Sequence, residues 1–257
     1  MQSLLGFGVG VVVCSCVYGQ HGGDVVLDLD KAGAIRTNRV GADGGPPEPA
    51  RVFASEFGEV FKNFADEPGF DSAPGTFPVP SANGFILRRA LRAWDGTAFS
   101  TIPAERVEVG FGPLDEVSTP IDDVPVTGFT LGVGSNGQWH RHLEFTLTAP
   151  ASPGVYLLEM SLFSTDPAVA ESAPFWVVFN QGQPEDVHDA AVDWAMRNLP
   201  HDVCESDVNA DGVVDSRDFF EFLAAFFASD GDFNEDGLTD SRDFFDFLAA
   251  FFAPCDH

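Results

Sequence analysis

The stretch HRHLEFTLT, from His140 to Thr148, is the clearest case of the strand pattern that fills most of this chain. Its apolar residues Leu143, Phe145 and Leu147 are each separated by one polar residue, and successive side chains of a β-strand point to opposite faces. The pattern therefore predicts a strand with one buried face. The other face would carry His140, His142, Glu144, Thr146 and Thr148.

Similar short apolar or alternating runs continue on both sides of this strand, from Asp24 to about Asn180. Clusters of Gly, Pro, Asp and Ser separate them at the spacing of an all-β sandwich. We therefore predict a β-sandwich domain over residues 20–182. Its loop GADGGPPEPA, residues 41–50, is expected to be irregular and exposed. The other runs are DVVLDLD, AIRTNRV, RVFASEF, GFILRRALRAW, RVEVGFG, TGFTLGV, GVYLLEMSLF and FWVVFN.

The period of the pattern changes after the last predicted strand. VHDAAVDWAMRNL, from Val187 to Leu199, has helical spacing, and Pro200 would end the helix. We interpret residues 183–200 as a helix that connects the sandwich to a C-terminal module, residues 201–257.

That module repeats one unit: DVNADGVVDSRDFFEFLAAFFA from Asp207 and DFNEDGLTDSRDFFDFLAAFFA from Asp232. Each copy has oxygen-bearing side chains at loop positions 1, 3, 5, 9 and 12 and glycine at position 6, the spacing of an EF-hand calcium loop. The backbone carbonyl at position 7 would complete each set. The predicted ligands of two calcium ions are Asp207, Asn209, Asp211, Val213, Asp215 and Asp218 in the first loop, and Asp232, Asn234, Asp236, Leu238, Asp240 and Asp243 in the second.

Each loop leads into a helix rich in phenylalanine. At 100° per residue its aromatic residues and its leucine are expected to form one broad apolar face, which a single helix cannot bury. Two such helices would pack on each other, which explains the duplication. The expected faces comprise Phe219, Phe220, Phe222, Leu223, Phe226 and Phe227, and Phe244, Phe245, Phe247, Leu248, Phe251 and Phe252.

No helix precedes the first loop, so the order is loop then helix. With two D-x-N-x-D-G-x-x-D-x-x-D loops, the segment from Cys204 to Cys255 resembles a dockerin. The resemblance implies calcium-dependent docking to a cohesin-like partner on a cell surface or scaffold. It also implies that loop positions 10 and 11 help to select the partner. These residues are Ser216 and Arg217 in the first repeat and Ser241 and Arg242 in the second. Because the two pairs are identical, the resemblance implies docking in either of two orientations.

Cys204 and Cys255 lie just outside the two repeats, one on each side. In an exported protein this placement favours a disulfide between the ends of the module, worth about 3–4 kcal/mol. Two free thiols or a shared metal are the alternatives. Cysteines in these positions resemble those of the dockerin subtype that anchors exported bacterial proteins.

Export is predicted from the first residues. An apolar stretch from about Leu4 to Val17 is too short for a membrane span and ends in small residues, so we expect a signal peptide over residues 1–19. The stretch departs from the usual signal peptide in one respect, because its n-region has no Lys or Arg. Cleavage before Cys16, as in a lipoprotein, is the alternative. The rest of the chain contains no apolar run of membrane-spanning length.

Forty acidic against thirteen basic residues give a net charge of -27. A nucleic-acid partner is excluded, because that binding needs a basic surface. Cations are the expected partners, although such a charge also keeps an exported protein soluble.

The β domain contains no nucleophile and base motif, metalloprotease helix or phosphate loop. His140, His142 and Glu144 are a candidate transition-metal site, with His21 a further candidate ligand, because alternate residues share a strand face. A solvated polar face is the other interpretation. A faint likeness to exported surface-anchored β proteins of unknown function names no activity.

We expect a secreted, non-catalytic surface protein with a calcium-dependent docking module. A dockerin-bearing hydrolase acting on polysaccharides, a carbohydrate-binding module and a transition-metal-binding surface protein are the alternatives.

Overall fold

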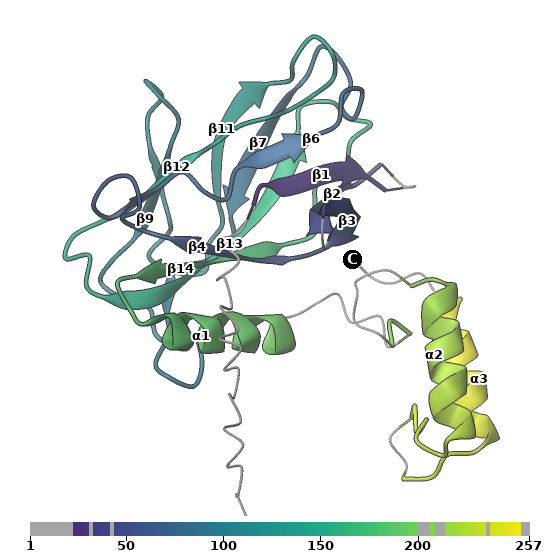
Figure 1. Ribbon diagram of the computed structural model, residues 1–257. Helices are drawn as coiled ribbons and strands as arrows, with labels where there is room; N and C mark the ends of the chain where they lie inside the picture. Colours follow the sequence, from purple (N-terminus) through teal and green to yellow (C-terminus); the bar gives the residue numbers. More distant parts are fainter. Residues whose placement is uncertain are drawn as a thin grey trace, which may run out of the picture.

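A computed structural model describes residues 23–30, 33–41, 44–199, 206–208, 214–234 and 237–252 of the chain. These residues are mainly β, with a small helical part, as predicted (Figure 1). The strands are β1 (Val25–Leu29), β2 (Ile35–Gly41), β3 (Gly45–Pro49), β4 (Val52–Glu56), β5 (Phe64–Ala65), β6 (Phe70–Ser72), β7 (Ala82–Leu87), β8 (Arg92–Ala93), β9 (Val107–Gly110), β10 (Val117–Ser118), β11 (Val126–Gly132), β12 (Glu144–Leu147), β13 (Gly154–Ser164) and β14 (Phe175–Gln181). The helices are α1 (Glu185–Asn198), α2 (Ser216–Phe227) and α3 (Ser241–Phe251).

The strands form three sheets. Two of them have four strands each, in the orders β3-β2-β1-β6 and β10-β9-β12-β5. The large sheet has the order β11-β7-β13-β14-β4, with β8 paired to β13. Most neighbours are antiparallel, but β1 runs parallel to β6, and β14 runs parallel to β4.

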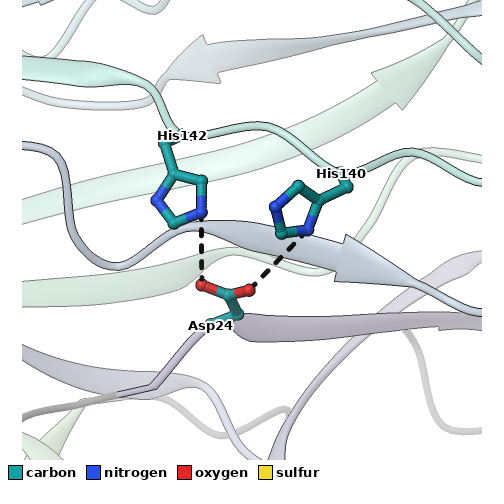
Figure 2. Close-up of side chains that lie close together, drawn as sticks. All are labelled: Asp24, His140 and His142. Carbon is teal, nitrogen blue, oxygen red and sulfur yellow. Dashed lines mark ion pairs between the residues drawn. The ribbon is translucent and has the colours of Figure 1, made fainter.

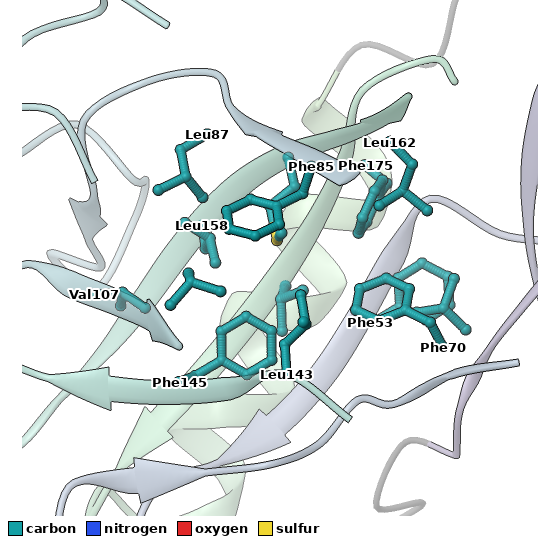
Figure 3. Close-up of a cluster of buried hydrophobic side chains, with 14 of the residues drawn as sticks. Phe53, Phe70, Phe85, Leu87, Val107, Leu143, Phe145, Leu158, Leu162 and Phe175 are labelled. Carbon is teal, nitrogen blue, oxygen red and sulfur yellow. The ribbon is translucent and has the colours of Figure 1, made fainter. Parts of the chain in front are cut away.

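One apolar core is shared by all three sheets (Figure 3). Phe70 of β6 contacts Phe175 of β14 with ring centroids 6.1 Å apart, and Phe145 of β12 contacts Phe179 of β14 at 5.2 Å. Both small sheets therefore pack against the large sheet through aromatic side chains. Edge and tilted contacts of this kind add to the free energy gained by burying the rings.

The alternation in HRHLEFTLT is confirmed by burial, because Leu143, Phe145 and Leu147 are at most 1 % exposed. The strand is shorter than predicted, however, since β12 begins only at Glu144. The preceding residues pair elsewhere: Arg141 forms an isolated antiparallel bridge with Phe70 of β6. The segment that carries His140 and His142 therefore lies beside β6, whereas Glu144 lies in a strand that pairs with β9.

The expectation of an irregular loop over residues 41–50 was wrong for β3, which pairs antiparallel with β2. Three of the five residues of β3 are prolines, which are rare inside a sheet because Pro lacks the N–H that a ladder needs. At the edge of a sheet the missing donor costs nothing, because only one side of the strand is paired. β3 occupies such an edge, and all five of its residues are exposed or half-buried, in line with the expected exposure.

Helix α1 does not serve only as a connector, because it packs against the large sheet. Ala191 and Ala195 are fully buried in a second apolar cluster with Trp176 and Val178 of β14. The small alanine side chains let the helix approach the sheet closely. Figure 1 shows α1 beside β14 and β4.

His188 anchors α1 to the same sheet. Its Nε2 lies 3.0 Å from the Val178 carbonyl oxygen, and its Nδ1 lies 3.1 Å from a Glu56 carboxylate oxygen. Burial alone would lower the pKa of His188, but the hydrogen bonds to Glu56 and Val178 outweigh it and raise that pKa.

In the part of the chain that the structure describes, none of the helices has both the length and the apolar composition that crossing a membrane requires.

Candidate metal centres

Both helices of the repeat module begin at a pair of predicted calcium ligands. Asp215 precedes α2, and its carboxylate accepts a hydrogen bond from the Arg217 N–H at 2.6 Å. In return, the Asp218 carboxylate accepts one from the Asp215 N–H at 2.8 Å. This reciprocal arrangement is a capping box, which satisfies N–H groups that have no partner within the helix. Loop positions 9 and 12 are thereby held next to each other.

The second repeat has the same geometry. The Asp240 carboxylate accepts from the Arg242 N–H, and the Asp243 carboxylate accepts from the Asp240 N–H, both at 2.7 Å. The equal hydrogen bonds follow from the equal sequences, because a capping box depends only on residues within one helical turn.

In the second loop, Asp243 also reaches back to the start of the loop. Its other carboxylate oxygen accepts hydrogen bonds from the N–H groups of Phe233 at 2.9 Å and Asn234 at 3.2 Å. The Asp232 carboxylate accepts from the Gly237 N–H at 2.8 Å, where Gly237 turns the chain with a φ of +87°. Loop position 12 is thus connected to positions 2 and 3, and position 1 to position 6, which brings the two ends of the loop together as a wrapped cation needs.

Two of the carboxylates that cap the helices, those of Asp215 and Asp243, favour their charged forms because their pKa values are lowered. Hydrogen bonds from backbone N–H groups, above all that of Asp240, lower the pKa of the buried Asp243 despite its burial. The Arg217 N–H likewise lowers the pKa of Asp215. An ionised carboxylate is the form that binds a hard cation.

The first loop is described only in part. Asp207 is half-buried, and the neighbouring Ser206 hydroxyl donates to the Ala250 carbonyl of α3 at 3.3 Å. Leu238, whose carbonyl was predicted as a ligand in the second loop, has an exposed side chain. Several predicted residues lie outside the described part of the chain: Asn209, Asp211, Val213, Asp236, Cys204, Cys255 and His21.

Helices α2 and α3 pack on each other, as predicted, but their phenylalanines do not all share one face. Phe222 and Phe247 are buried against each other. Phe220 and Phe227, by contrast, are 66 % and 80 % exposed. They lie seven residues apart, close to two helical turns, and so share a second face that points away from the partner helix.

The corresponding face of α3 has nearly the same exposure, since Phe245 is 65 % and Phe252 is 79 % exposed. The residues at loop positions 10 and 11 are exposed as well: Ser216, Arg217, Ser241 and Arg242. Large apolar side chains are thus exposed at equivalent positions of both repeats. The expectation of a single buried aromatic face was wrong because two helices in contact cover only the side that each turns to the other.

A second group of candidate ligands lies in the β structure. His140, His142 and Asp24 each offer an atom that could bind a metal, and these atoms lie within 4.8 Å of one another (Figure 2). The two oxygens of Asp24 lie 3.8 Å from His140 Nδ1 and 3.8 Å from His142 Nε2.

Glu144, which was predicted to join the two histidines, is not part of this group. Its carboxylate accepts a long hydrogen bond of 3.4 Å from the Gly112 N–H, and its strand β12 pairs with β9. The physical reason is the change of pairing described above: the strand alternation does not extend from Glu144 back to the histidines. Asp24 takes its place from a position more than a hundred residues earlier in the chain, which no local pattern indicates.

A small pocket between α1 and the large sheet has a volume of about 90 Å³ and contains Arg89, Arg92 and Trp194 in its walls. Pockets for small organic ligands usually measure roughly 300–1,000 Å³. The pocket therefore gives no support to a sugar-binding or hydrolytic site.

Comparison of the chain with models of known protein families and with curated proteins gives no match.

Proposed function

We propose that this protein is an exported, non-catalytic β protein whose C-terminal repeat module binds two calcium ions and docks in a calcium-dependent manner to a cohesin-like domain. The observation that carries the proposal is the equivalence of the two repeats. Each helix begins at a carboxylate pair in a capping box, and each exposes the same serine, arginine and two phenylalanines.

Calcium is the ion that the donors fit. Asp232, Asn234 and Asp243 offer oxygen atoms, and hydrogen bonds already draw the two ends of their loop together. Hard cations such as Ca²⁺ prefer oxygen ligands in sets of six to eight, and a flexible loop supplies them without strict geometry. Asp at position 12 has a shorter side chain than the usual Glu, so we expect weaker binding than in a Glu-terminated loop.

Calcium would act on docking through the loops. Several carboxylates converge in each loop, and their mutual repulsion opposes the folded form until a cation binds. The first helical turn would then be held in place, with the side chains at positions 10 and 11 presented beside the exposed phenylalanines. Docking would be lost with calcium because these side chains belong to the same turn as the ligands.

The exposed face of each helix has the composition of a protein interface. Exposed aromatic residues next to arginine are enriched at such interfaces, where they supply most of the binding free energy. Phe220, Phe227, Ser216 and Arg217 meet this description, and α3 repeats it. Two equivalent faces also support docking in two orientations.

The test is a calorimetric titration of the full-length protein with calcium, followed by a titration with a panel of cohesin domains with and without chelator. We expect two calcium ions per chain, a gain of helical circular dichroism and a cohesin complex that chelator dissociates. A chain that binds no calcium would refute the proposal. Calcium binding without any effect on cohesin binding would refute the docking role.

A further inference from the structure

We propose that Asp24, His140 and His142 form a binding site for a divalent transition-metal ion of the zinc class on the outer face of the β structure. The inference is independent of the calcium module, because all three residues belong to the β domain. It rests on strand register, on one glycine and on the orientation of the imidazoles (Figure 2).

Strand register places the three ligands side by side. β6 is the central strand: it pairs in parallel with β1, so that Val25 lies opposite Phe70, and it is bridged on its other side by Arg141. The backbone hydrogen bonds between Phe70 and Arg141, at 2.8 and 2.9 Å, hold this register. One residue before Val25 and Phe70, and one residue after Arg141, the same register places Asp24, Gly69 and His142 in one row across the three segments.

The same register places Asp71 and His140 in the next row on the same face, because side chains two residues apart share a face. Val25 and Phe70 point the other way and are fully buried in the core. The ligands therefore lie on the face away from the core. Their side chains are 26 %, 51 % and 36 % exposed for Asp24, His140 and His142, which leaves an ion open to water on one side.

Gly69 makes the approach of Asp24 and His142 possible. A Cβ atom at this position would lie 2.4 Å from the Asp24 carboxylate and 2.6 Å from the His142 ring. Any other residue at the centre of the row would push the two ligands apart. Glycine is otherwise unfavourable next to a strand, and close approach of other groups is one of the reasons for which it occurs there.

His142 is oriented by its second ring nitrogen. Nδ1 lies 3.1 Å from the Asp66 carbonyl oxygen and 3.5 Å from a Glu67 carboxylate oxygen. With its proton on Nδ1, the ring donates to the carbonyl and leaves the lone pair of Nε2 directed at Asp24. This is the arrangement by which proteins select the ligating nitrogen of a histidine.

The distances suit a small ion. Zinc binds nitrogen and oxygen at about 2.0–2.2 Å, so two ligands in a tetrahedral shell are about 3.4 Å apart. The two separations of 3.8 Å in the structure are slightly longer, and small side-chain rotations would close the difference. Two imidazoles favour Zn²⁺, Cu²⁺ or Ni²⁺ over Ca²⁺ or Mg²⁺, which prefer oxygen alone.

An outer carboxylate completes the site. Asp71 Oδ1 lies 3.2 Å from His140 Nδ1 and is held by hydrogen bonds from the Ser72 N–H at 2.9 Å and from Gln138 Nε2 at 3.0 Å. Together with Glu67, it adds negative charge around the two imidazoles. This charge favours a dication, and Asp71 offers a further carboxylate oxygen within reach of His140.

The test is a calorimetric titration of the full-length protein with Zn²⁺, in calcium at a saturating concentration so that the acidic loops do not compete. We expect one zinc ion per chain whose binding His142→Ala, His140→Ala or Asp24→Asn weakens at least about tenfold. Co²⁺ should give a visible absorption spectrum typical of nitrogen and oxygen ligands without thiolate, and Zn²⁺ should displace it.

Two variants make the test specific. Gly69→Ala keeps every ligand but separates Asp24 from His142, so we expect about 10–100-fold weaker zinc binding with the thermal unfolding of the β domain still cooperative. Glu144→Gln changes a nearby carboxylate outside the site and should bind zinc like the unmodified protein.

The proposal would be overturned if zinc binding were absent, or if it were unaffected by changes at all three ligands. The histidines would then only form ion pairs with Asp24. A loss of zinc binding in Glu144→Gln, with binding unchanged in Asp24→Asn, would also overturn the assignment of Asp24, since the ion would then lie over β12.

Discussion

The rings of Phe222 and Phe247 stack on each other with centroids 4.0 Å apart and an angle of 11° between their planes. They occupy the same position in the two repeats and are 3 % and 0 % exposed. Phe233, from the loop between the helices, packs edge-on against both rings. The contact is therefore the centre of a small aromatic core to which both repeats contribute.

Removal of one of these rings should unfold the helix pair. We expect Phe247→Ala to cost about 3–5 kcal/mol, as for other buried phenylalanines, and to reduce the helical circular dichroism signal. Phe252→Ala is the matched control, because it removes the same side chain from an exposed position and should change stability by less than about 0.5 kcal/mol. Equal effects of the two substitutions would contradict the assigned packing.

The capping carboxylates should also be calcium ligands. Asp218→Asn removes one charge with little change of shape, and we expect calorimetry to count one calcium ion per chain in place of two. Asp243→Asn should do the same for the second loop. Glu221→Gln, on the exposed side of α2, should leave the count at two. A count that stayed at two in both ligand variants would show that position 12 does not bind the ion.

Two equivalent docking faces predict redundancy. Phe220→Ser or Phe245→Ser alone should leave binding to a cohesin domain within about twofold of the unmodified protein, because the other face still docks. The double variant should lose binding by at least about a hundredfold, since buried aromatic anchors contribute about 2 kcal/mol or more each. A large loss in either single variant would show that docking uses one orientation.

His188 predicts how the stability of the β domain depends on pH. Because its pKa is raised in the folded protein, the protonated form is favoured by folding. This stabilisation is fully present below the unfolded pKa of about 6.5 and is lost as the pH rises through the higher folded pKa. We expect His188→Gln to cost about 1–3 kcal/mol at acidic pH and less at higher pH.

The measurement is the difference in free energy of unfolding between the unmodified protein and His188→Gln at a series of pH values around neutrality. The difference removes contributions from groups shared by both proteins, including His140 and His142. A difference that grew with pH would mean that burial and not the Glu56 carboxylate dominates the pKa of His188.

Much of the repeat module could be predicted from sequence because its structure is local. The starts of α2 and α3, at Ser216 and Ser241, follow from Asp215 and Asp240, whose capping hydrogen bonds span at most one turn. The pairing of the two helices followed from their apolar residues. Which phenylalanines stay exposed could not be predicted in this way, because their exposure depends on the angle at which the second helix lies.

In the β domain, the alternation of Leu143, Phe145 and Leu147 was sufficient to predict burial, since strand side chains alternate whatever the neighbouring strand is. The identity of that neighbour was not predictable. β5, β6 and β10 have only two or three residues each, and β3 contains three prolines, so their sequences carry little strand pattern and they were not recognised.

The metal site shows the same division. That His140 and His142 share a face could be predicted from their spacing of two residues. That Asp24 and not Glu144 joins them could not, because it depends on the register of β1, β6 and residues 140–142. Register between strands distant in the chain is set by the packing of the whole core, and no short stretch of sequence contains that information.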